Sequence, residues 1–254
     1  MFHINRTSIL LFHVKHFLLC GKIKEKTTKV IFMPIYTPSL LSVDAAETRR
    51  YAGLAKAEFD ESSIAAACEE AALLAAPRAR WELYDYDCET GRVASDPPFA
   101  IQGNSIRKHL AGTERVVFLA ATIGEAVEDA VTRHFDEGRY AHSVLLDAAA
   151  TAAVEQVCDA CETMLRLQFA KEGFSMRWRF SPGYGDWDVH AQPDLLRLTQ
   201  AETIGVSLTE SFMLRPRKSV TAVIGLLRGG TDAGKAAPKG CAVCPKRDCP
   251  FRQA

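Results

Sequence analysis

The chain has 254 residues, of which 48% are hydrophobic and 24% are charged. This is the composition of an ordinary globular protein that can bury a sizeable core. Basic and acidic residues number 31 each, so the formal net charge is zero. Because binding to phosphates requires a basic surface, this balance argues against nucleic acid as the main partner. The length suits one large domain or two small ones.

The first 32 residues are basic and apolar, but their apolar runs are interrupted by His13, Lys15 and His16. No run approaches the roughly 20 apolar residues that cross a bilayer, so we expect no membrane span. A secretory signal would also need a small-residue cleavage site, which is missing. We expect residues 1–32 to be a poorly ordered extension, with Met33 as the natural start. The alternative is an added strand or a membrane-surface segment.

The eight cysteines stand at positions 20, 68, 88, 158, 161, 241, 244 and 249. Without a secretion signal, a disulfide framework is not expected, and a reducing, cytoplasmic compartment is the default. Cys158 and Cys161 are three residues apart and would share one face of a helix. Two ligands alone make a poor metal site, so we interpret this pair as small buried residues.

Local signals predict helices alternating with short strands between residues 44 and 137. Asp44 and Glu47 have the spacing of a capping box, which predicts a helix from there to about residue 56. The run 116–121 is apolar and of strand length, which predicts a buried strand. The other elements expected here are a helix at 64–76, strands at 80–87, 93 and 99–101, and helices at 105–111 and 125–137.

The second half predicts one long helix over residues 140–171, rich in alanine. The triplet 176–178 should end a strand. Further elements are expected as a helix at 193–200, strands at 203–206 and 220–227, and a flexible linker at 228–235. Glu155 lies in the middle of the long helix among small apolar residues. Taken alone it would be read as an exposed helical glutamate.

The stretch from Arg179 to Trp187 predicts a rigid, sharply bent loop. Pro182 fixes its own φ angle, while the two glycines permit conformations that other residues resist. Arg179 offers a planar fork of donors for a carboxylate or phosphate, and Tyr184 and Trp187 offer flat aromatic faces. On the residues alone, a structural turn and a ligand-binding loop are about equally supported.

Two motifs carry a family resemblance. The run Arg179-Phe-Ser-Pro-Gly183-Tyr184 resembles the Arg-x-x-x-Gly-Tyr motif of the activation domain of cobalamin-dependent methionine synthase. The run Gly205-Val-Ser-Leu-Thr-Glu-Ser-Phe212, followed by Pro216 and Ser219-Val220, resembles a second motif of that domain. A weaker resemblance reaches back to about Val116. The resemblance implies an α+β fold over residues 33–228, with a curved, mostly antiparallel sheet and packed helices.

The resemblance also implies a function, which is the reductive reactivation of a corrinoid. Cob(II)alamin on a separate methionine synthase that lacks its own activation domain would receive a methyl group from S-adenosylmethionine. An electron donor such as flavodoxin or ferredoxin would supply the electron. The chain contains no Asp-x-His-x-x-Gly motif, the usual source of the cobalt-ligating histidine. The cobalamin is therefore expected on the partner.

The resemblance assigns roles to five residues. Arg179 would bind the carboxylate of S-adenosylmethionine through a bidentate pair. Glu155, which aligns to within a residue with a glutamate of the family, would face the ammonium or sulfonium group. Ser181 and Gly183 would present backbone groups to the ligand. Tyr184 would lie beside the methyl path or the corrin, so Glu155 and Tyr184 are the catalytic candidates.

The tail of residues 229–254 contains Cys241, Cys244 and Cys249 at C-x2-C-x4-C spacing. Three thiolates at this spacing can reach one zinc ion or iron–sulfur cluster, with a fourth ligand from elsewhere. The alternative is a set of free thiols on a mobile tail. The tail departs from the methionine synthase domain and leaves two other functions open. One is a redox activator of another corrinoid methyltransferase system, and the other is a non-catalytic module that docks on a corrinoid protein.

Overall fold

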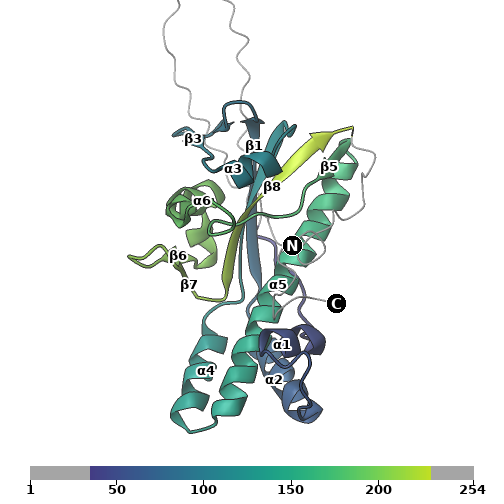
Figure 1. Ribbon diagram of the computed structural model, residues 1–254, viewed down its shortest axis with the longest axis vertical. Coiled ribbons are helices and arrows are strands. Elements are labelled where there is room, and N and C mark those ends of the chain that lie inside the picture. Colours follow the sequence, from purple (N-terminus) through teal and green to yellow (C-terminus); the bar gives the residue numbers. More distant parts are fainter. Residues whose placement is uncertain (1–34, 230–254) are drawn as a thin grey trace, which may run out of the picture. The chain divides into compact units, whose positions relative to one another are not determined.

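The computed structural model describes residues 35–229, which belong to one compact unit, Met33–Ala254. A six-stranded sheet in the order β3-β2-β1-β4-β8-β5 forms the centre of this unit (Figure 1), and every neighbouring pair is antiparallel. The strands are β1 (Arg78–Asp87), β2 (Arg92–Val93), β3 (Phe99–Ala100), β4 (Arg115–Thr122), β5 (Phe174–Met176) and β8 (Ser219–Arg228). The expectations for residues 1–32 and for the three tail cysteines lie outside the described residues.

Strand β4 occupies the middle of the sheet and is buried on both faces, as its continuous apolar run predicts. Successive side chains of a strand point to opposite faces, so the run divides between two layers of core. Val117, Leu119 and Ala121 contribute to the larger cluster, and Val116 and Phe118 to the cluster on the other face. Helices must therefore cover both faces of the sheet.

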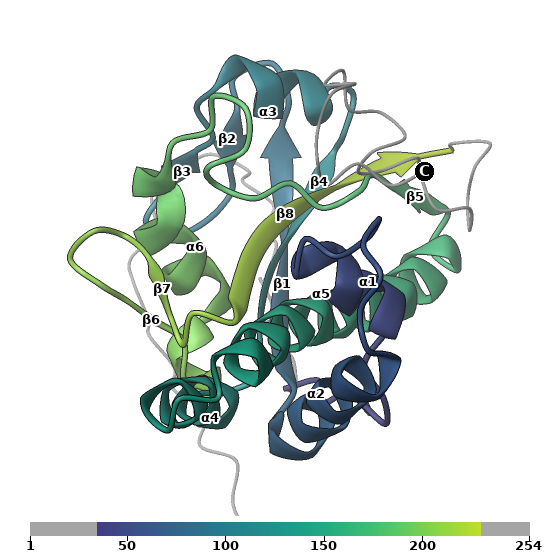
Figure 2. The ribbon, with the colours of Figure 1, turned by 60° about the horizontal axis from the view of Figure 1, so that its bottom comes forward.

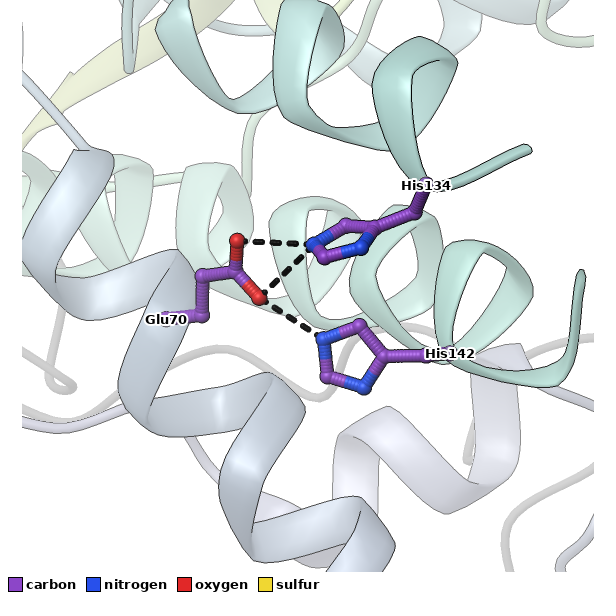
Figure 3. Close-up of side chains that lie close together, drawn as sticks. All are labelled: Glu70, His134 and His142. Carbon is purple, nitrogen blue, oxygen red and sulfur yellow. Dashed lines mark hydrogen bonds and ion pairs between the residues drawn. The ribbon is translucent and has the colours of Figure 1, made fainter. Parts of the chain in front are cut away.

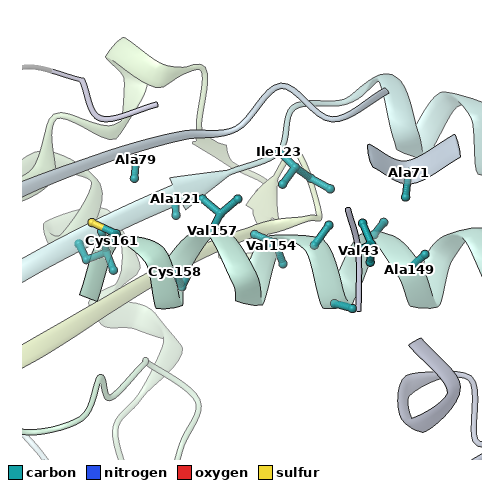
Figure 4. Packing of buried hydrophobic residues seen from close by; sticks show 14 of the residues in the cluster. Val43, Ala71, Ala79, Ala121, Ile123, Ala149, Val154, Val157, Cys158 and Cys161 are labelled. Atoms are coloured by element: carbon teal, nitrogen blue, oxygen red, sulfur yellow. The ribbon is translucent and has the colours of Figure 1, made fainter. Parts of the chain in front are cut away.

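One face is covered by helices α1, α2, α4 and α5. Their bounds are α1 (Ala45–Tyr51), α2 (Glu61–Leu74), α4 (Ala126–Asp136) and α5 (Tyr140–Ala170). Figure 2 shows α1, α2 and α4 around α5, and each of the three contacts it. Alanines along α5 allow this close approach, and Val154, Val157, Cys158 and Cys161 carry the core toward the sheet (Figure 4).

The opposite face is covered by α3 (Asn104–His109), α6 (Gln192–Thr199) and two 3₁₀ helices, η1 (Val189–Ala191) and η2 (Ala201–Ile204). A separate two-stranded hairpin joins β6 (Ser207–Leu208) to β7 (Leu214–Arg215). The α+β class, with an antiparallel sheet and packed helices, is confirmed. Of the described helices, none is both long enough and apolar enough to cross a membrane.

Two expected elements are wrong in part. The strand expected to start at residue 203 begins only at Ser207, because residues 203 and 204 belong to the 3₁₀ helix η2. Gln200 and Gly205 have positive φ angles on either side of it, which bend the backbone out of the extended form. The helix expected to reach residue 56 ends at Tyr51, because Gly53 adopts a φ of 75°. Asp44 caps it as expected, accepting from the Ala46 and Glu47 amides. The other half of the capping box differs, because the Asp44 amide donates to Gln156 and the Glu47 carboxylate pairs with Arg50.

Candidate functional site

The loop that carries the first motif crosses the edge of the sheet beside β8. A strand was expected to end within residues 176–178. The structure shows that this strand is β5 and that it ends at Met176. The chain then stays tied to β8, since the Arg177 amide donates to the Gly225 carbonyl. Phe180 and Val223 exchange both of their backbone hydrogen bonds. Arg179 is thus fixed between two backbone anchors.

The turn after Phe180 closes on itself. The Gly183 amide donates to the Trp187 carbonyl at 2.7 Å, and the Tyr184 amide donates to the Ser181 carbonyl at 3.2 Å. Gly183 has a φ of 91°, which explains the need for glycine there. These bonds occupy the Gly183 amide and the Ser181 carbonyl. The backbone groups that these residues could offer a ligand are therefore the Ser181 amide and the Gly183 carbonyl.

Asp186, near the end of the loop, binds the loop to the start of α3. Asp186 accepts hydrogen bonds from the Asn104 and Ser105 amides at 2.7 and 2.8 Å, at a helix start whose N-cap is Gly103. These backbone donors lower the pKa of Asp186. A Cβ atom on Gly185 would lie 2.8 Å from Ser105, so the close approach requires glycine.

Arg179 lies in an ion cluster on the surface of α5. Its Nη1 donates to Asp159 at 2.7 Å and to Glu162, and its Nη2 donates to Glu155. The Arg179 side chain is only 13% exposed and that of Glu162 only 4%, whereas Glu155 and Asp159 are 34% and 52% exposed. Arg166 lies 4.0 Å from Glu162. The three carboxylates stand at i, i+4 and i+7, so they share one face of the helix.

Arg179 is a cation held among three acidic side chains of α5. Burial alone would lower the pKa of the Arg179 guanidinium, but the surrounding acidic groups raise it above its ordinary value. Burial also raises the pKa of the Cys161 thiol to about 12 and that of Cys158 further still. Both cysteines are fully buried, which confirms their interpretation as small core residues. Burial in apolar surroundings makes both thiols poor nucleophiles.

Of the two rings expected to offer a flat surface, only Tyr184 does so. Its exposed fraction is 57%, and partial desolvation followed by the Glu155 charge raises the pKa of its hydroxyl. The pKa of the Tyr51 hydroxyl, on α1, is also raised, first by burial and then by the Glu155 charge. Trp187 is buried in the core beside Phe180, so its expected role as a surface platform is wrong. The charge of Glu155 therefore acts on two phenol groups.

The residues of the second motif lie in two places, the β6–β7 hairpin and a contact between Lys218 and α5. Phe212, at the tip of the β6–β7 hairpin, has its ring centroid 4.4 Å from that of His190, which follows the Arg179 loop. Met213 beside it is exposed. Further along, Lys218 Nζ lies 2.9 Å from both Asp147 and Thr151 of α5. The motif thus connects the surroundings of the loop to the face of α5 that carries Glu155.

The two hollows that the described residues enclose most clearly do not contain the candidate residues. Among the described residues, a hollow of about 390 Å³ lies along α1, α4 and α5, and another of about 430 Å³ lies beside β1 and β2. Neither is lined by Arg179, Ser181, Gly183, Tyr184 or Glu155. The first hollow includes Tyr51 and Thr151. Since Thr151 is one helical turn before Glu155, this hollow begins beside the candidate surface.

No protein-family model and no curated protein sequence matches the chain. Among solved structures, the chain is similar to the crystal structure of the MetH reactivation domain bound to AdoHcy. The TM-score is 0.49 and the sequence identity is 13%, over 75% of this chain and 81% of that chain. A likeness at this level does not carry a ligand or an activity from one protein to the other.

The structure also brings together residues that the sequence did not single out. Asp159 and Glu162 complete the cluster around Arg179, and their spacing from Glu155 was a signal that could have revealed them. A second group, formed by Glu70, His134 and His142, joins three helices. Its members are separated by up to 72 residues along the chain, so no local motif indicates it.

Proposed function

We propose that the surface formed by Arg179, Glu155 and Tyr184 binds S-adenosylmethionine, and that the chain delivers its methyl group to a corrinoid on a separate methionine synthase. The observation that carries this proposal is the meeting of Arg179 with Glu155, which is 24 residues away in the chain. The exposed Tyr184 lies beside them. The resemblance of the two sequence motifs to the methionine synthase activation domain supports the same assignment.

The charge of the surface suits such a ligand. Three carboxylates and the two guanidinium groups of Arg179 and Arg166 give these five side chains a net charge of minus one. S-adenosylmethionine carries two positive charges and one negative charge, so its net charge is plus one. Glu155 and Asp159 are accessible enough to face its ammonium and sulfonium groups. A ligand without the sulfonium charge gains less from this surface.

Arg179 would not bind the ligand carboxylate through both terminal nitrogens, as the resemblance implies. Both of its terminal nitrogens already donate to carboxylates of α5, while its Nε donates to no acceptor among residues 35–229. The ligand carboxylate would therefore approach along the Nε edge or displace the half-exposed Asp159. The amide of Ser181 and the carbonyl of Gly183 remain for the rest of the ligand. The carboxylates hold the guanidinium in place before any ligand binds.

The proposed reaction is a methyl transfer from sulfur to cobalt. The bond between the methyl carbon and the sulfonium sulfur breaks, its electron pair stays on sulfur, and S-adenosylhomocysteine leaves. The partner's corrinoid cobalt, after one-electron reduction by a flavodoxin- or ferredoxin-type donor, supplies the electron pair for the new bond. The protein contributes by positioning donor and acceptor, since the cofactor carries the hard chemistry. The exposed ring of Tyr184 would guide the methyl path or the corrin.

Calorimetric titration of the full chain tests the binding step. S-adenosylmethionine should bind more tightly than S-adenosylhomocysteine, because only the former carries the sulfonium charge. Glu155→Gln should weaken binding of S-adenosylmethionine by about tenfold to a hundredfold, the range of a charge-assisted interaction, and should reduce the preference between the two ligands. Glu172→Gln, at an exposed glutamate beyond α5, is the matched control. Equal affinity for the two ligands in the wild-type protein contradicts the proposal.

A further inference from the structure

Glu70 of α2, His134 of α4 and His142 of α5 converge at one point, where the three helices meet (Figure 3). The His134 Nε2 atom lies 2.9 and 3.1 Å from the two oxygens of the Glu70 carboxylate. The His142 Nε2 atom lies 2.7 Å from one of these oxygens. Both imidazole rings thus direct the same nitrogen at a single carboxylate.

This donor set is one that proteins use for zinc. Two imidazole nitrogens and one carboxylate, with a water in the fourth position, form an open tetrahedral site. Ligand bonds of about 2.0–2.1 Å place neighbouring ligand atoms about 3.3 Å apart. The nitrogen–oxygen distances here are 2.7–3.1 Å, and the ligand atoms all lie within 4.8 Å of one another. For these nitrogen–oxygen pairs, an ion would require shifts of only a few tenths of an ångström.

The surroundings favour a cation at this point. The His134 side chain is only 5% exposed, so a ligand there would be shielded from bulk water. Its Nδ1 has no hydrogen-bond partner among the described residues, whereas its Nε2 faces Glu70. Glu70 and His142 are about a quarter exposed, which leaves a route for an ion and its water.

The cluster is separate from the candidate methyl-donor surface. His142 and Glu155 lie on the same helix, 13 positions apart, which corresponds to about 20 Å along the helix axis. The cluster joins the C-terminal part of α4 to the beginning of α5 and to α2. An ion here would hold the three helices together without touching the surface near Arg179.

We propose that Glu70, His134 and His142 bind one divalent transition-metal ion, for which zinc is the expected occupant, and that this ion fastens α2 to α4 and α5. Metal binding replaces two hydrogen bonds to one carboxylate with three metal–ligand bonds. The Nδ1 atom of His134 lacks the partner that usually orients a metal-bound imidazole. The affinity should therefore be lower than that of a fully supported zinc site, by about 10–100-fold.

The test uses cobalt(II) and zinc(II) with the full chain in which Cys241, Cys244 and Cys249 are changed to serine. These changes remove the other expected metal ligands. Cobalt(II) should produce visible d–d absorption that saturates at one equivalent and lacks thiolate charge-transfer bands. Zinc(II) should displace it and raise the thermal midpoint, because a ligand that binds only the folded state stabilises it. Absence of saturable binding, or of a rise in the midpoint, overturns the proposal.

Variants locate the ion without disturbing the buried His134. His142→Gln and Glu70→Gln should each weaken zinc binding by at least about tenfold, while Glu69→Gln, at the exposed neighbour on α2, should leave it unchanged. Circular dichroism confirms that each variant is folded. A loss smaller than tenfold in both cluster variants means that the three side chains form only an ion pair. Titration with S-adenosylmethionine should be unaffected in all of them, so this test is independent of the proposed function.

Discussion

Replacing Arg179 with methionine should destabilise the protein substantially, because it removes the cation that three carboxylates share. Methionine keeps most of the apolar length of the side chain, so the change reports mainly on charge. Glu162 would be left almost completely buried with only Arg166 nearby, at 4.0 Å. The perturbation therefore measures how strongly the site is held before any ligand binds.

The magnitude follows from the burial of each partner. Removing one member of a buried pair costs about 3–5 kcal/mol, and this range applies to Glu162. The pairs with Glu155 and Asp159 are closer to the surface and are worth about 0.2–1 kcal/mol each. Since Arg166 offsets part of the loss at Glu162, we expect a total near the lower end, about 3 kcal/mol. Arg179→Lys should lose less, because it keeps the charge but not the fork.

Urea unfolding at neutral pH measures the free energy of unfolding of each variant. Arg139→Met, which breaks an exposed pair with Glu137, is the control and should cost no more than about 1 kcal/mol. The double variant Arg179→Met/Glu162→Gln should recover at least about 1 kcal/mol relative to the sum of the single changes. If Arg179→Met costs less than about 1 kcal/mol, or if the double variant is additive, the cluster does not hold Arg179 as described.

Three further predictions concern the loop anchors and the tail. Gly225→Ala should cost about 1–3 kcal/mol in a urea titration, because its Cβ would lie 2.6 Å from Thr113; an unchanged midpoint would show that the contact can relax. The lowered pKa of Asp186 means that its contribution to stability is present above its unfolded pKa, about 3.9, and is lost as pH falls through its folded pKa. Asp186→Asn should therefore be less stable at neutral pH and should lose less stability between pH 5 and acid; parallel acid curves would exclude this role. Protein purified without oxygen should contain zinc or iron beyond any ion held by Glu70, His134 and His142, and this additional metal should disappear when the three tail cysteines become serine; a metal content that the serine changes leave the same would favour free thiols.

Much of the fold could be predicted from the sequence, because local signals agree with the final packing. The apolar run at 116–121 is a central strand, and the alanine-rich run at 140–171 is a helix within one residue of its expected limits. The segment 203–206 was wrongly predicted to be a strand because Thr203, Ile204 and Val206 are residue types that favour strands. The left-handed conformations of Gln200 and Gly205 decided its shape, and Gln200 gives no such warning.

The candidate surface could be predicted only in part. The pairing of Arg179 with the helix depends on how the loop lies over α5, which no local pattern contains. The burial of Trp187 follows from the second core cluster rather than from its loop sequence. The convergence of Glu70 with two histidines depends on the contacts among three helices. Such groupings require the tertiary structure, since their members are distant in the chain.

Formation of methylcobalamin tests the proposed function most directly. The full chain would be mixed with a methionine synthase that lacks its own activation domain and carries cob(II)alamin, together with a reductant and S-adenosylmethionine labelled in its methyl group. We expect the label to appear in methylcobalamin on the partner, with a lower yield for Glu155→Gln and a loss of stability of no more than about 1 kcal/mol. If the cobalt is reduced but no labelled methylcobalamin forms with any corrinoid partner, the proposed methyl transfer is contradicted, and a redox activator becomes the better account.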